Sequence, residues 1–343
     1  MKLAEKIPLL YHRFLDDLIG ITVPEEEIAR CSSCGLCQHP KSPYQETKCC
    51  NYQPFQANFL VGAILSDSSD QMKTGKRLTE ELIQQRKGLT AFGLIPDRKY
   101  QQNQHQILTL PKSFHNQEEI ISQRCSFLHE GHCSIWAYRE HLCITYFCSS
   151  VGASTGQQFW SELNEMMKHI EYQLAQHFAQ KLGITWPENF TEAFYEDHFE
   201  LSDIEHWGPW HGKEDAFFKE CFTLLQELDQ KNFQEICFGK SESSLEELKQ
   251  LALNFEQAAF PKFLRLDENI RFENANPGNI KLCLNSREAT VPALILPFLR
   301  KFDGTQTTSD LFQLAYTVLY DLNAHVEELL EKKMLLNCYA PDQ

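Results

Sequence analysis

Apolar residues recur at helical spacing over residues 155–182. A repeat of three to four residues places such side chains on one face of a helix, so this segment predicts a long helix whose stripe belongs to a core. The sequence also predicts helices over residues 1–30, 66–88, 190–232 and 244–260. The stripe consists of Phe159, Leu163, Met166, Met167, Ile170, Leu174, Phe178 and Leu182.

The pattern changes after Pro261. Ile280, Leu282 and Leu284 alternate with Lys281 and Cys283, which predicts a strand over 279–284 because strand side chains point alternately to the two faces of a sheet. The apolar content of the other segments predicts strands at 89–95, 106–110, 269–273 and 334–337, and helices at 287–301, 308–320 and 323–333.

These elements predict a mixed α+β chain that is mostly helical and has three blocks. We expect a cysteine-rich domain over 1–153, an acidic helical region over 154–261 and a domain of strands and helices over 262–343. The middle block carries 7 Lys and Arg against 20 Asp and Glu, within a chain of net charge −15. This acidity disfavours nonspecific binding to nucleic acid or anionic membranes. A basic partner could face the middle block, but solvated helix faces explain its charge more simply.

The sequence predicts a cytoplasmic protein. The most continuous apolar stretch, Val291–Leu299, is interrupted by two prolines and is too short to cross a bilayer. The brief apolar run Ile7–Tyr11 is soon followed by Asp16 and Asp17, which is not the pattern of a secretory signal. We therefore expect no membrane association.

Cysteine is the most informative residue type in the chain. In a reducing compartment, clustered cysteines serve as ligands or catalysts more often than as disulfides. Nine of the 13 cysteines lie in two clusters, and the other four are single residues that read as small buried side chains. The predicted metal ligands are Cys31, Cys34, Cys37, Cys49 and Cys50 in the first cluster, and Cys125, Cys133, Cys143 and Cys148 in the second.

The C-x-x-C-x-x-C spacing of Cys31, Cys34 and Cys37 lets thiolates converge on one ion, and Gly35 can supply the turn. Three such thiolates cover one face of an iron–sulfur cluster or three corners of a zinc tetrahedron. Lys41 stands where the bacterial ferredoxin run would have its next cysteine. The candidate cofactors are therefore iron, as an iron–sulfur cluster, or zinc. Buried free thiols and a redox-active dithiol are weaker alternatives.

The second cluster resembles the zinc- or iron-chelating cysteine-rich domain family called YkgJ-like. The resemblance is carried by the Phe127-Leu128 pair after Cys125, by Gly131-His-Cys133-Ser-Ile135, by Arg139 and by the two later cysteines. It covers about residues 31–148. The chain departs from the family at Gln38, where a doubled cysteine is expected, and at Glu140, where proline is usual.

The resemblance implies metal binding and leaves the metal open. Flagellin lysine N-methylases are relatives of this family, so the resemblance also points towards protein modification. No Gly-rich strand–turn–helix for S-adenosylmethionine is present, which argues against simple methyl transfer of the doubly wound type.

Residues 262–338 resemble the PqqD-like peptide-recognition module, a small winged helix. The resemblance rests on Leu284-Asn285, on the apolar segment after it, and on Asp303-Gly304-Thr-Gln-Thr307. It implies a peptide or protein partner that adds a strand at a sheet edge. A winged helix used only for packing is the alternative, and DNA binding is disfavoured because the block is mildly acidic.

Other candidate sites carry a simpler explanation. His206–His211 holds two tryptophans between two histidines, which could bind a metal or simply pack. Gly152–Gly156 fits a nucleophile elbow but more simply begins a helix. His129, His132 and His141 lie within the second cluster and could replace a cysteine as a zinc ligand.

The leading functional hypothesis is metal binding in the service of peptide or protein modification, with the C-terminal module recognising a peptide. The sequence leaves catalysis open. The competing hypotheses are a non-catalytic protein for metal storage, sensing or delivery, and a scaffold that zinc only stabilises.

Overall fold

The computed structural model places most of the residues that it describes in helices, with several small antiparallel sheets, which confirms the mostly helical α+β class. Within the described residues, none of the helices is both long and apolar enough to cross a bilayer. The structure describes residues 1–26, 31, 49–96, 100, 124–147, 150–184, 207–239, 243–315 and 322–337.

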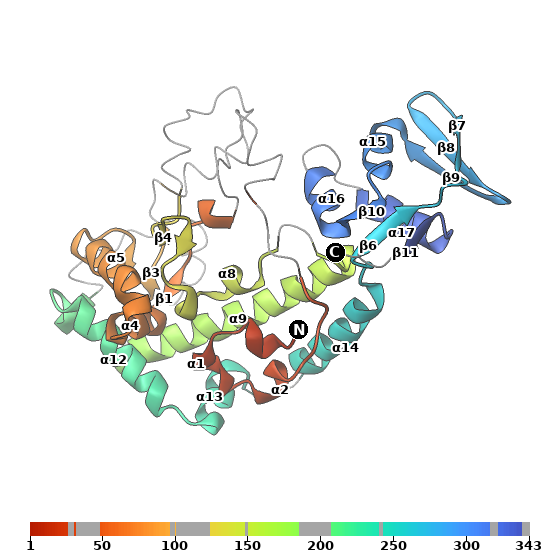
Figure 1. The fold of residues 1–343 in the computed structure, drawn as a ribbon. Helices are drawn as coiled ribbons and strands as arrows, with labels where there is room; N and C mark the ends of the chain where they lie inside the picture. Colours follow the sequence, from red (N-terminus) through yellow and green to blue (C-terminus); the bar gives the residue numbers. More distant parts are fainter. Residues whose placement is uncertain are drawn as a thin grey trace.

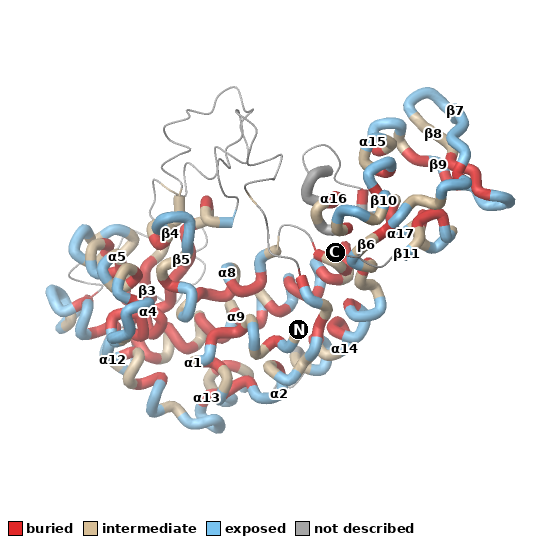
Figure 2. Tube along the Cα trace, viewed as in Figure 1, coloured by how far each residue is buried: buried red, intermediate tan, exposed pale blue. Residues whose placement is uncertain are grey.

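The longest helix, α9 (Ala153–Lys181), forms the axis of the first core and runs between the other helices (Figure 1). Its apolar stripe is buried, which confirms the helix predicted over 155–182. Figure 2 shows that buried positions run along α9 and into the helices beside it. The helices that pack on α9 are α4 (Asn58–Ser66), α8 (His141–Thr145), α12 (Glu214–Glu227), α13 (Gln230–Cys237) and α14 (Ser243–Ala258).

Helix α4 is buried on all sides because nearly every residue in it is apolar. The buried Asn58 side chain donates hydrogen bonds to the carbonyl oxygens of Ala91 and Ala175, which ties α4 to both a sheet and α9. The elements around α4 are η4 (Asp70–Met72), α5 (Lys73–Gln84) and a sheet of order β1-β3-β2, formed by β1 (Gln56–Ala57), β3 (Gly93–Leu94) and β2 (Leu89–Thr90).

The helix predicted over residues 1–30 is wrong for the part that the structure describes. Residues 1–26 fold into three short helical pieces, and the Met1 ammonium donates to the Val23 carbonyl oxygen at 2.8 Å. Closing the segment on itself buries its apolar side chains from several directions, so tertiary packing overrides the helical periodicity. The pieces are η1 (Leu3–Glu5), α1 (Leu9–His12) and α2 (Asp16–Ile19).

The C-terminal residues build a second hydrophobic core. One sheet has the order β7-β8-β9 and another the order β10-β6-β11. The predicted strand over 279–284 is confirmed as β8. The elements are β6 (Phe263–Leu266), β7 (Arg271–Asn274), β8 (Asn279–Leu284), β9 (Arg287–Pro292), η8 (Ala293–Ile295), α15 (Leu296–Leu299), β10 (Asp303–Thr307), α16 (Thr308–Ala315), α17 (Leu322–Glu331) and β11 (Leu335–Asn337).

The helix predicted over residues 287–301 is wrong. Residues 287–292 form strand β9, and only the single turns η8 and α15 follow. Ala289 and Val291 are buried while Glu288 and Thr290 are exposed, which is the two-residue period of a strand pairing with β8.

The division of the chain at residues 153 and 261 stays a prediction. The first core takes buried residues from both sides of position 153, from Leu3 to Phe255. The segment predicted as a strand at 106–110 lies outside the described residues.

Replacing Gly62 with alanine should destabilise the protein by about 1–3 kcal/mol, because overpacking forces neighbours to move. A Cβ atom at this position in α4 would overlap the carbonyl oxygen of Phe218 in α12. Gly20→Ala is the control, since its Cβ would lie 3.7 Å from the carbonyl oxygen of Asp16, an ordinary van der Waals contact. Urea unfolding measures both variants, and equal stabilities would contradict this packing.

Candidate functional site

One cysteine of each predicted cluster takes part in a backbone contact between the two segments. Cys49 and Cys50 lie in a short helical turn, η3 (Cys49–Asn51). The backbone N–H of Cys125, the first cysteine of the second cluster, donates to the carbonyl oxygen of Cys50 at 2.7 Å. The Gln53 side chain reinforces this junction by accepting from the backbone N–H of Ser126 at 2.8 Å. Segments far apart in sequence are therefore joined at their cysteines.

A small hairpin carries the next cysteine. Strands β4 (Leu128–His129) and β5 (His132–Cys133) pair so that Cys133 lies opposite Leu128. Glu130 and Gly131 form the turn with φ values of 49° and 78°, a conformation that glycine adopts without strain. A short 3-10 helix, η6 (Trp136–Tyr138), then leads to α8, which carries Cys143.

The thiols of the second cluster influence one another. Burial raises the pKa of Cys125 to about 12 and also raises the pKa of Cys133. Desolvation by the surrounding protein raises the pKa of Cys143, and the Glu140 carboxylate and the other two thiols add to the effect, although Cys143 retains an exposed surface. Thiolates repel one another at these positions, so a bound cation would stabilise them.

Arg139 supplies positive charge beside these thiols. Its guanidinium lies 3.5 Å from the centroid of the Trp136 ring, and its Nη2 atom donates to the Lys6 carbonyl oxygen. Burial lowers the pKa of Arg139, and Cys133 and Cys143 oppose that effect. Its buried Nε atom has no hydrogen-bond partner within the described part of the chain.

The structure places only some of the predicted ligands. Cys34, Cys37 and Cys148 lie outside the described residues. Cys31 is described, but its neighbours in the sequence are not. The Sγ atoms of Cys49 and Cys50 are 3.8 Å apart. Among the residues that the structure describes, no three cysteine sulfurs lie within 4.8 Å of one another. The grouping of the nine cysteines into sites stays a prediction.

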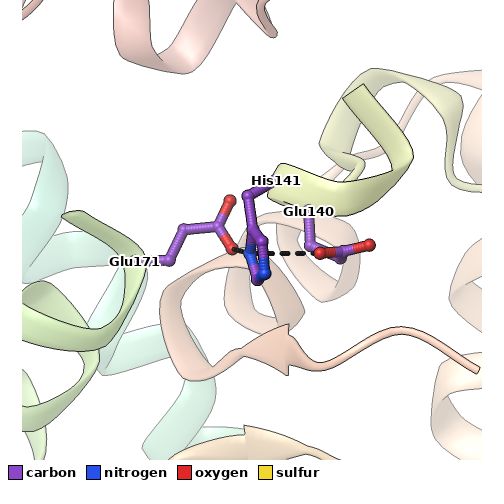
Figure 3. A group of neighbouring side chains, drawn as sticks. All are labelled: Glu140, His141 and Glu171. Atoms are coloured by element: carbon purple, nitrogen blue, oxygen red, sulfur yellow. Dashed lines mark hydrogen bonds and ion pairs between the residues drawn. The ribbon is translucent and has the colours of Figure 1, made fainter. Parts of the chain in front are cut away.

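The side chains that do converge are Glu140, His141 and Glu171 (Figure 3). The Nδ1 atom of His141 lies 2.6 Å from Oε2 of Glu171 and 3.1 Å from Oε2 of Glu140. All three residues are buried. The Tyr11 hydroxyl donates to Oε1 of Glu171 at 2.9 Å, so the N-terminal segment also reaches this group.

Glu140 has a second role as the N-cap of α8. Its carboxylate accepts hydrogen bonds from the backbone N–H groups of Leu142 and Cys143, at 2.8 and 2.9 Å. A carboxylate suits this position because the first N–H groups of a helix lack partners and carry partial positive charge. Because one of these N–H groups belongs to Cys143, the Glu140 carboxylate links the glutamate–histidine group to the second cysteine cluster.

The pKa shifts follow from burial and charge. Burial would lower the pKa of His141, but the carboxylates of Glu171 and Glu140 outweigh it and raise the pKa above its usual value. Burial also raises the pKa of Glu171, against the opposing effect of His141. The Glu171 carboxylate and the His141 imidazolium therefore stabilise each other's charged forms, whereas the charge of Glu140 favours the imidazolium and disfavours the ionised form of Glu171.

Sequence reasoning missed the two glutamates. Glu171 occupies the apolar stripe of α9, between Ile170 and Leu174, and an acidic residue on a core-facing stripe was the available signal. Glu140 stands where the resembled family usually has proline, and that departure was the second signal. His141 was one of three histidine candidates; His129 and His132 are exposed.

The remaining candidates fold as their simpler explanations predict. Trp207 is buried against the rings of Phe217 and Phe218, and Trp210 donates from Nε1 to the Leu182 carbonyl oxygen, so both rings pack. His206 lies outside the described residues. Gly152 and the residues after it begin α9.

Comparison of the chain with protein-family models, with curated proteins and with solved structures found no match. The resemblances to the YkgJ-like and PqqD-like families therefore stay predictions from sequence.

Tyr11→Phe should lower the free energy of unfolding by about 1–3 kcal/mol, because it removes a hydrogen bond from a fully buried carboxylate. Tyr138→Phe is the matched control. Its hydroxyl donates to Asp67 at 2.8 Å in a partly exposed setting, so we expect a loss of about 1 kcal/mol or less. Denaturant unfolding of both variants compares them, and an equal or smaller loss for Tyr11→Phe would contradict the role given to Glu171.

Proposed function

We propose that this chain is a metal-binding protein that holds zinc or an iron–sulfur cluster through cysteines of both clusters. The ligands come from Cys31, Cys34, Cys37, Cys49, Cys50, Cys125, Cys133, Cys143 and Cys148. The observation that carries the proposal is the hydrogen bond between the Cys125 N–H and the Cys50 carbonyl oxygen, which joins the two clusters.

The chemistry around the thiols fits such a group. Thiolates are preferred ligands of zinc and of iron–sulfur clusters. A centre with several thiolates carries net negative charge. The Arg139 guanidinium lies near Cys133 and Cys143 and would offset that charge. Its buried Nε atom has no hydrogen-bond partner in the described part of the chain. A bound iron–sulfur cluster would supply electron transfer, and zinc would supply Lewis acidity or a structural cross-link.

The exposure of two cysteine residues is the feature that separates the competing roles. Cys49 and Cys143 are exposed, while the single cysteines Cys221 and Cys237 are buried. A metal held partly at the surface can meet a substrate or exchange a ligand, whereas a closed four-thiolate zinc site would act as a scaffold. This exposure supports a role in peptide or protein modification over a purely structural one.

Cys125→Ser and Cys143→Ser should each lower bound iron or zinc at least roughly tenfold, because losing a ligand costs at least as much as losing a second-sphere contact. Full-length protein is purified anaerobically, its metals are measured by mass spectrometry, and its visible spectrum is recorded. Brown absorbance together with bound sulfide would identify an iron–sulfur cluster. A colourless protein that contains zinc would identify zinc as the cofactor.

Cys283→Ala is the matched control, since Cys283 is a buried residue of strand β8 and should leave the metal content unchanged. The proposal fails if both serine variants keep the wild-type metal content, or if the wild-type protein binds neither metal after reconstitution.

For the C-terminal block we propose peptide recognition by a winged-helix-like module. Strand β7 is at the edge of its sheet and all four of its residues are exposed. Phe272 in this strand is 37% exposed and lies beneath Arg300, with 5.7 Å between the guanidinium and the ring centroid. An exposed edge strand offers unpaired backbone groups to an added strand, which supports this mode of binding.

A photo-crosslinking residue in place of Phe272 should capture a peptide or protein in cells that make the full chain. The control places the same crosslinking residue at Leu253, which is 52% exposed. Leu253 belongs to α14, a helix whose buried face is part of the first core. Mass spectrometry identifies the captured chains. Partners enriched at position 272 over 253 are expected, and identical captures at both positions would contradict peptide binding at β7.

A further inference from the structure

We propose a second metal site, formed by Glu140, His141 and Glu171, that binds a first-row divalent cation through oxygen and nitrogen. It is separate from the cysteine ligands and does not depend on them. Three potential ligand atoms lie within 4.8 Å of one another, one from each residue, and all three residues are buried (Figure 3).

The Nδ1 atom of His141 lies close to an oxygen of each of the two carboxylates. The Nδ1 atom of an imidazole carries at most one proton, and that proton serves the Glu171 carboxylate at 2.6 Å. The Glu140 oxygen nevertheless lies 3.1 Å from the same nitrogen. Two carboxylates are thus directed at one nitrogen, and a cation at their meeting point would contact all three side chains while Oε2 of Glu140 keeps its hydrogen bond from the Leu142 N–H.

The distances match a coordination shell. Metal–ligand bonds of about 2.0–2.2 Å put neighbouring ligands of an octahedron roughly 3 Å apart. The distances from Nδ1 of His141 to the Oε2 atoms of Glu171 and Glu140 are 2.6 and 3.1 Å, one below and one above that ligand–ligand distance. Small side-chain movements would therefore be enough to seat an ion.

Charge balance favours a divalent ion. The two carboxylates and a neutral imidazole together carry charge −2, which a divalent cation neutralises, whereas a proton on His141 leaves one negative charge buried. Across the described ranges of the chain, no Lys or Arg forms an ion pair with Glu140 or Glu171. The Tyr11 hydroxyl already donates to Glu171, so the carboxylate is held in place from outside the site.

The ligand set selects the type of ion. Carboxylates suit Mg²⁺, Ca²⁺ and Mn²⁺, and imidazole suits transition metals, so the mixed set fits Mn²⁺, Fe²⁺ or Zn²⁺. Mn²⁺ is the best probe because it avoids thiolates and is paramagnetic. Cys143 is exposed and its backbone N–H donates to Glu140, so an ion can approach along that side.

The test uses full-length protein, Mn²⁺ alone and electron paramagnetic resonance. We expect one class of bound Mn²⁺ with electron spin-echo modulation from a directly bound histidine nitrogen. Glu171→Gln should weaken Mn²⁺ binding at least roughly tenfold. Glu26→Gln is the matched control, since Glu26 is also buried but accepts its hydrogen bonds from Ser150, Val151 and Trp160 and should leave binding unchanged.

Cys125→Ser separates this site from the cysteine proposal, because it should lower bound iron or zinc and leave Mn²⁺ binding intact. The nitrogen signal is measured on wild-type protein, so the outcome does not depend on how well a variant folds. Mn²⁺ that shows no nitrogen modulation, Mn²⁺ affinity that is unchanged in Glu171→Gln, or no Mn²⁺ binding by the wild type would each overturn the proposal.

Discussion

A carboxylate on the core-facing side of α9 needs partners, and much of the first half of the structure is arranged to supply them. Glu171 is fully buried among apolar residues of the longest helix. An ionised group in that setting is stable only if hydrogen bonds and an opposite charge satisfy it. Tyr11 supplies the hydrogen bond from the N-terminal segment, and His141 supplies the charge from α8.

This constraint extends from the core to the cysteines. His141 lies beside Glu140, which caps α8 and accepts from the backbone N–H of Cys143. The position of Cys143 is therefore set by a series of polar contacts that begins at α9. A separate hydrogen bond, from the backbone N–H of Cys125 to the carbonyl oxygen of Cys50, connects the segments that carry the two cysteine clusters. The proposed oxygen–nitrogen site therefore lies next to Cys143, one of the proposed sulfur ligands.

The parts of the fold that could be predicted are those in which one periodicity dominates. The stripe of α9 and the alternation of β8 are local signals, and both elements were predicted from them. The segment 287–301 was assigned to a helix on its apolar content, although Ala289 and Val291 already alternate with polar residues. Residues 1–26 carry helical spacing, but closure of the segment between Met1 and Val23 decides their structure.

The candidate site shows the same limit. The cysteines could be singled out by residue type and spacing, whereas their meeting depends on a long-range contact that no local pattern encodes. Glu171 was hidden within an apolar stripe, and its meaning depends on where Tyr11 and His141 lie. Glu140 was visible only as a departure from a family pattern. Long-range polar contacts thus account for most of what sequence reasoning missed.

The most direct test of the central claim is X-ray absorption at the iron and zinc edges of full-length protein purified anaerobically. The account predicts that the bound metal has sulfur neighbours at about 2.3 Å, the distance of metal–thiolate bonds. A first shell made only of oxygen and nitrogen at about 2.0–2.1 Å, or the absence of both metals, would contradict the claim that the joined cysteine clusters hold it.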